Sequence, residues 1–120
     1  MQGESILKTL DQELLAWAHQ SVTTIGGEPS DRKKYKTAVK GSPAFIQSCG
    51  LAQAYAFWMA KDNEFGYHRL RNHLSNAPGL QGLDASVRDA DIETYSFLTQ
   101  RTQSALVFLK RMVDAYIEDK

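Results

Sequence analysis

Cysteine is nearly absent from this 120-residue sequence, which holds only Cys49. One cysteine can neither form an internal disulfide nor by itself hold a structural zinc ion, so a disulfide scaffold and a zinc module are both excluded. Long apolar runs are also absent: none approaches the roughly 18 residues of a membrane-spanning helix, and the first residues lack the order of a signal peptide. We therefore expect a cytoplasmic protein that makes no use of a membrane.

Motifs for catalysis or metal binding are missing as well. The three histidines never form an i, i+4 pair, and Glu64 with His68 is a single ligand pair, too few for zinc or a di-metal site. No phosphate-cradling glycine loop and no glycine-flanked nucleophile occurs. Cys49 has no basic neighbour in sequence and is interpreted as a small buried hydrophobic residue. The sequence predicts no catalytic residue, no metal and no cofactor.

Net charge is absent, since fourteen basic side chains balance fourteen acidic ones. The charges are nevertheless unevenly distributed. Residues 1–31 carry one base and five acids, residues 32–71 eight bases and two acids, and residues 84–120 five bases and seven acids. If the middle segment presents its bases on one surface, this neutral protein has a local positive patch that attracts phosphates.

What the sequence does contain is helical periodicity. Apolar residues recur at steps of three and four, and no segment alternates with a period of two over a useful length, so a sheet is not expected. The length suits one domain. We predict an all-α fold, a single-domain antiparallel helical bundle over residues 1–120 with a long C-terminal helix.

Glycine and proline divide this pattern into helices. The first runs through the first 22 residues, with Ile6 on its apolar face, and the second, capped by Ser30 or Asp31, ends at Gly41. A third is expected to begin at Pro43 and to bend or break near Gly50. A short helix over residues 64–76 follows, and from Asp84 a capping segment leads into a last helix of about 27 residues, about 40 Å long.

The most apolar segment, residues 51–61, belongs at the centre of the bundle. Its aromatic run Tyr55–Met59 is interpreted as core packing in preference to a base-stacking platform, with Trp58 left open. We expect Phe57, Trp58, Leu98 and Leu109 to be buried. The last helix should pack through a seam that also includes Tyr95 and Tyr116.

Basic residues of the second helix share one face. At about 100° per residue, Arg32, Lys33, Lys36 and Lys40 fall within about 100° of one another, on a different side from Tyr35, Ala38 and Val39. We call these four bases the basic stripe. A solvated helix face is the ordinary explanation of such a stripe, and a phosphate-binding surface is the functional one.

Several spaced residues resemble the small subunit of the Cmr complex, the type III-B CRISPR effector. Their order and spacing extend over roughly residues 30–118. They are Lys34-Tyr35-Lys36, Ala38, Pro43, Ile46, Gly50-Leu51, Ala56-Phe57, Lys61, Tyr67, Leu70, Leu74, Tyr95, Thr99, Ala105-Leu106 and Phe108-Leu109-Lys110-Arg111.

The resemblance implies a non-catalytic building block of an RNA-guided antiviral complex. In that family, several copies stack into an inner filament beside the subunits that grip the guide RNA, and other subunits cut the target. The implied partners are therefore other CRISPR effector subunits, further copies of this chain, and guide and target RNA bound without sequence specificity. Combined with the charge pattern, it indicates these RNA-binding residues: Arg32, Lys33, Lys34, Lys36, Lys40, Lys61, Lys110 and Arg111.

Three alternatives stay open. The first is a small subunit of another CRISPR effector type, either III-A or I. The second is a DNA-binding module in which a short helix over residues 43–49 imitates a helix-turn-helix, although that helix bears no base-reading side chains. The third is a small helical RNA-binding protein or metal-independent ribonuclease, with His73 as general base beside Arg69.

Overall fold

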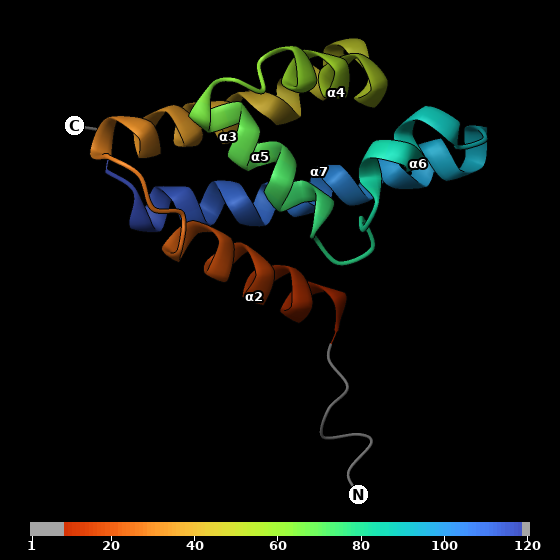
Figure 1. Ribbon diagram of the computed structural model, residues 1–120. Coiled ribbons are helices and arrows are strands. Elements are labelled where there is room, and N and C mark those ends of the chain that lie inside the picture. Colours follow the sequence, from red (N-terminus) through yellow and green to blue (C-terminus); the bar gives the residue numbers. More distant parts are fainter. Residues whose placement is uncertain (1–8, 119–120) are drawn as a thin grey trace, which may run out of the picture.

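The computed structural model describes residues 9–118, and in that part of the chain it consists of helices with no strand (Figure 1). The prediction of an all-α fold is confirmed. Ile6, expected on the first helix, lies outside the described residues. The helices are α2 (Leu10–Thr23), α3 (Pro29–Cys49), α4 (Leu51–Ala60), α5 (Phe65–Ser75), α6 (Leu83–Asp89) and α7 (Ile92–Tyr116).

Helix α3 is longer than the sequence predicts, because it continues through Pro43. Its N-cap is Glu28, which precedes the expected Ser30 or Asp31. Pro29 occupies the first turn, where a backbone N–H would have no partner within the helix. Proline inside a helix removes one backbone hydrogen bond. Burial of Val39 and Ile46 on either side of Pro43 holds the helix together across that point. The predicted separate helix over residues 43–49 is therefore wrong, and the helix-turn-helix alternative loses its basis.

The predicted break at Gly50 is confirmed. Gly50 has φ +90°, a backbone conformation that side-chain-bearing residues rarely adopt, and it separates α3 from α4. The Tyr95 hydroxyl, from α7, accepts a hydrogen bond from the Ala52 backbone N–H at 2.9 Å. This contact satisfies one of the unpaired donors at the start of α4 and fixes the corner against α7.

Helix α5 crosses α3 at very short range (Figure 1). A Cβ atom at Gly66 would lie 2.7 Å from the Lys34 carbonyl oxygen, which is closer than side chains tolerate. Glycine is thus required at this position because the α3 backbone occupies the space of a side chain. This approach places the start of α5 beside the basic N-terminal half of α3.

The chain after Asp84 forms a separate short helix, α6, before α7 begins at Ile92. Asp91 caps α7 by accepting a hydrogen bond from the Thr94 backbone N–H at 2.8 Å. Helix α7 has 25 residues, which corresponds to about 37 Å. The predicted seam is buried at Leu98, Thr102, Ala105, Leu109 and Val113. Tyr116, by contrast, is 55% exposed, so the seam ends before it.

Helices α2 and α3 both pack against α7, in opposite directions. Lys36 bonds to Ile117 and Gln103 bonds to Pro43, so α3 runs antiparallel to α7. Helix α2 lies on another side of α7 and runs in the same direction, as the colours of Figure 1 show. The result is a flattened molecule with extents of 46 × 34 × 20 Å.

The core confirms three of the predicted buried residues and corrects two others. Trp58, Leu98 and Leu109 are buried, so Trp58 is a core residue. Phe57 is 36% exposed, and its ring contacts those of Phe45 and Tyr67. Cys49 is also exposed, contrary to the expectation of a buried thiol, and its Sγ hydrogen-bonds to the Phe45 carbonyl. Cys49 is the last residue of α3.

Candidate nucleic-acid interface

Lys33 and Lys34 line a groove between the N-terminal half of α3 and the start of α5. The groove has a volume of about 450 Å³. We call it the lysine groove, and it is lined by Ser30, Lys33, Lys34, Thr37, Glu64 and Tyr67. Lys34 is exposed and Lys33 is half-buried, so both ammonium groups belong to a surface that a ligand can reach.

Lys61 extends this basic surface toward α4. It is the C-cap residue of α4, and its Nζ lies 3.7 Å from the Glu64 carboxylate in the lysine groove. The same Nζ lies 5.8 Å from the centre of the Phe57 ring. The structure thus brings Lys33, Lys34 and Lys61 to one side of the molecule, although they come from two helices.

Lys36 faces away from this groove, so the basic stripe is not the continuous exposed surface that the helical period predicts. Its side chain is buried, and its Nζ donates to the Ile117 carbonyl at 2.7 Å and lies 3.6 Å from the Asp114 carboxylate. Lys40 Nζ is 2.8 Å from the same carboxylate. The hydrogen bond from Lys40, with the nearby charge of Lys36, lowers the pKa of Asp114. These two lysines tie α3 to α7.

The other predicted bases are also divided between locations. Arg32 donates through Nη1 to the Gly27 carbonyl and so fastens the turn before α3. Lys110 and Arg111 are exposed near the end of α7, and neither lines the lysine groove. Of the eight predicted RNA-binding residues, two, Lys33 and Lys34, therefore line one groove, and Lys61 lies beside it.

A second groove adjoins the first and was missed by the sequence analysis. It has a volume of about 250 Å³ and shares Tyr67 with the lysine groove. We call it the aromatic groove, and it is lined by Ala38, Gly41, Ser42, Phe45, Phe57, Trp58 and Tyr67. The available sequence signal is that Phe57 and Trp58 are adjacent and lie about 100° apart around the helix, so only a wide apolar face can bury both rings.

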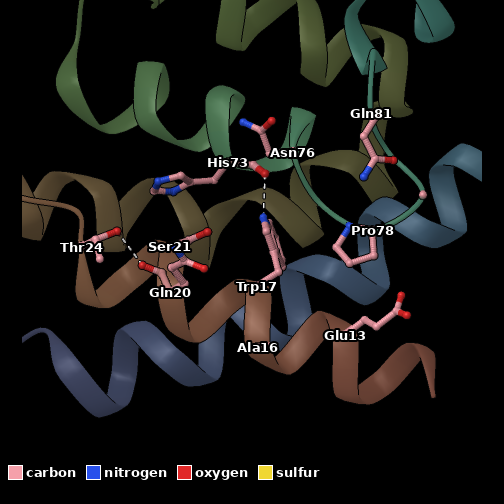
Figure 2. A pocket seen from close by; sticks show the side chains of 11 residues that line it. Glu13, Ala16, Trp17, Gln20, Ser21, Thr24, His73, Asn76, Pro78 and Gln81 are labelled. Carbon is pink, nitrogen blue, oxygen red and sulfur yellow. Dashed lines mark hydrogen bonds between the residues drawn. The ribbon is translucent and has the colours of Figure 1, made fainter. Parts of the chain in front are cut away.

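A further pocket, of about 720 Å³, lies between α2 and the end of α5 with the loop that follows (Figure 2). Trp17 donates through its indole N–H to the His73 carbonyl at 2.9 Å across this pocket. The His73 ring turns inward, where Nδ1 and the buried Tyr35 hydroxyl share a 2.7 Å hydrogen bond. The pocket is lined by the polar residues Glu13, Gln20, Thr24, Asn76 and Gln81 together with the apolar Ala16, Trp17 and Pro78.

His73 is poorly suited to the ribonuclease role. Burial, with added repulsion from the Arg69 charge, lowers its pKa to about 4, whereas an efficient general base has a pKa close to the working pH. The Arg69 guanidinium lies over the Phe65 ring, 4.9 Å from its centre. The arrangement therefore stabilises the α3–α5 crossing and supplies no matched acid–base pair.

Two further features bear on the kind of site. In residues 9–118, no three histidine, cysteine, aspartate or glutamate side chains are grouped so that they can hold a metal ion. None of the described helices is both long enough and apolar enough to cross a membrane.

Comparison with known proteins identifies the family. The model of the CRISPR-associated protein family Cas_Cmr5 matches residues 10–116. The chain belongs to the Cas_Cmr5 family. It is 27% identical to the CRISPR system Cmr subunit Cmr5 of Thermus thermophilus over 108 residues, which cover 86% of this chain and 94% of the relative.

The fold agrees with this assignment. The crystal structure of a CRISPR-associated Cmr5 family protein from Thermus thermophilus superposes with a TM-score of 0.80 at 28% identity, covering 93% of this chain and 100% of the other. The resemblance inferred from spaced residues is thereby confirmed, and among the alternatives the Cas_Cmr5 family is the one that the comparisons support. The matched range includes both grooves and the whole of α7.

Proposed function

We propose that this chain is a non-catalytic small subunit of a Cmr effector complex in antiviral defence, and that it binds the RNA backbone through Lys33, Lys34 and Lys61. The observation that carries the proposal is the lysine groove. Lys33, Lys34 and one acid, Glu64, line an open groove on a protein that is neutral overall, and Lys61 lies beside it, 3.7 Å from the Glu64 carboxylate. Phosphate groups are the ligands that such a local excess of lysine attracts.

In this proposal the remaining predicted bases have different roles. Lys36 and Lys40 hold α3 against α7 at Asp114. Lys110 and Arg111, exposed on α7, form a second contact surface for RNA or for a neighbouring subunit. One copy with a few phosphate contacts binds weakly, whereas copies stacked along one strand in a filament gain affinity through their high effective concentration.

Replacing Lys33 and Lys34 together by alanine should weaken binding of target RNA to the assembled complex, equally for all sequences. Phosphate contacts carry no sequence information, so guide pairing still selects the target. The salt dependence, measured as the slope of log affinity against log salt concentration, should decrease by about 0.7 for each lysine–phosphate pair that is removed. Fluorescence anisotropy between about 50 and 200 mM salt measures both quantities.

Lys110→Ala with Arg111→Ala is the matched comparison, since it removes two charges from the second proposed contact surface. Arg88→Ala, on exposed α6 beside Asp89, should change nothing. Unchanged affinity and slope in the Lys33/Lys34 variant, with normal assembly, would move the RNA path elsewhere. A loss confined to the Lys110/Arg111 variant would place that path on α7.

The chain by itself should leave single-stranded RNA intact, with or without divalent metal. The reason is that His73 bonds to buried Tyr35 and has a pKa of about 4. Gel analysis of labelled RNA incubated with purified protein checks this result. Cleavage that disappears in His73→Ala, yet persists in His68→Ala, would establish a ribonuclease instead.

A further inference from the structure

We propose that the aromatic groove stacks unpaired bases of the RNA strand whose phosphates lie on the lysine groove. The inference rests on the proposed function and adds the form of RNA that the site accepts, a single strand with exposed base faces. Phe57 is the central ring of the site, with Phe45 and Tyr67 on either side.

The first support is that an aromatic surface is open where the sequence predicts only core. Phe45 and Phe57 are each 36% exposed, although Trp58, the next residue, is fully buried. Neighbouring positions of α4 thus divide the two roles: Trp58 supports the core and Phe57 faces outward. Exposing large aromatic side chains together forfeits hydrophobic stabilisation, and such patches commonly mark binding sites.

The geometry of the rings supports stacking by a ligand. Phe57 lies 5.2 Å from Phe45 and 5.3 Å from Tyr67 between ring centres, at interplanar angles of 67° and 89°. Phe57 therefore contacts each of the other two rings edge to face, and neither contact is a parallel stack. A nucleobase is a flat aromatic group that takes up parallel stacking on such a ring, whatever its sequence identity.

Charge decides what kind of partner fits. Lys61 Nζ lies 5.8 Å from the centre of the Phe57 ring, and Tyr67 lines both grooves. The two grooves are therefore continuous at Tyr67, and a ligand that extends from Phe57 past Tyr67 contacts first the aromatic groove and then the lysine groove. Single-stranded RNA alternates flat bases and anionic phosphates, which matches this combination. An apolar protein segment would offer no anion to Lys33 and Lys34.

Base pairing should abolish this part of the binding. In a duplex both faces of each internal base are already stacked, so Phe57 has nothing to contact, whereas the lysines still meet phosphates. The site is therefore expected to prefer unpaired RNA over a duplex of equal charge. A strand of ribose phosphates without bases should likewise make no stacking contact with Phe57, although its phosphates still contact the lysines.

The test compares the full chain and its Phe57→Leu variant on two ligands, oligoadenylate and an abasic ribose-phosphate strand of the same length. Leucine keeps an apolar side chain but offers no ring, and near-UV and far-UV circular dichroism confirm that the variant is folded. Phe57→Leu should lower the affinity for oligoadenylate about 5- to 100-fold and leave the affinity for the abasic strand unchanged. Phe97→Leu is the matched control, because Phe97 is 49% exposed on α7 and has Arg101 over its ring.

The outcomes separate this inference from the proposed function. Equal affinity for both strands, insensitive to Phe57→Leu but lowered by Lys33→Ala with Lys34→Ala, would overturn stacking and leave phosphate binding in place. If Lys33→Ala with Lys34→Ala changes the affinity for neither strand, or if the chain binds no RNA at all, the proposed function is overturned as well. If Phe57→Leu prevents self-association or complex assembly while RNA affinity is unchanged, the aromatic groove is a protein contact and the inference is wrong.

Discussion

Replacing Leu109 by alanine should lower the free energy of unfolding by about 2–5 kcal/mol. Leu109 is fully buried in the C-terminal half of α7, on the same helix as the equally buried Leu106 and Val113. Helix α7 contacts both α2 and α3, so a cavity at this point weakens the packing of three helices together. The rest of the core closes such a cavity only in part, and the surrounding side chains lose their packing partners.

Chemical denaturation followed by circular dichroism measures this change. Val107→Ala provides the control, since Val107 is 46% exposed on the same helix and its truncation should change stability by no more than about 0.5 kcal/mol. A change of that small size at Leu109 would mean that the seam of α7 is not packed as described.

Acidification from pH 7 to pH 4 should cost this protein about 3 kcal/mol of stability through His73 alone. In the unfolded chain the histidine has its ordinary pKa near 6.5, whereas burial and the Arg69 charge lower it to about 4 in the folded state. As the pH falls through this interval, the unfolded chain binds a proton and the folded chain does not. The stabilisation is therefore complete above about pH 6.5 and is lost progressively down to about pH 4.

His73→Gln isolates this contribution, because the amide keeps hydrogen-bonding capacity toward the Tyr35 hydroxyl but does not titrate. Unfolding free energies at pH 7, 5.5 and 4 should decrease more steeply for the wild-type chain than for the variant. Carboxylates with lowered pKa values, such as Asp62 and Asp114, titrate in both proteins and cancel in the difference. Parallel curves would show that His73 is protonated in the folded state without penalty.

His73 also illustrates what a sequence motif leaves undecided. The spacing of Arg69 and His73 places both on one helix, which is the requirement for the ribonuclease hypothesis. Only the packing of α5 on α3 decides that the ring meets the buried Tyr35 hydroxyl. The same side chain therefore becomes a structural group, because its partner comes from a segment 38 residues away.

The sequence by itself determined the helical class, the break at Gly50, the burial of Trp58, Leu98 and Leu109, and the resemblance to the Cmr small subunit. These follow from local chemistry: the period of apolar residues, the backbone freedom of glycine, and the spacing of residues along one chain. Such features can be detected from the sequence alone because they depend on residues that are close together along the chain.

Tertiary structure alone decided which polar faces stay open. The helical period places Lys36 beside Arg32 and Lys40, but α7 covers that side of α3, so Lys36 is buried against Ile117. Helix α5 instead packs closely on α3, because Gly66 leaves room for the Lys34 backbone. This packing forms the lysine groove and places the Tyr67 ring against Phe57. Periodicity determines which residues share a face, whereas the helix that covers a face comes from a distant part of the chain, and this contact depends on the packing of the whole core.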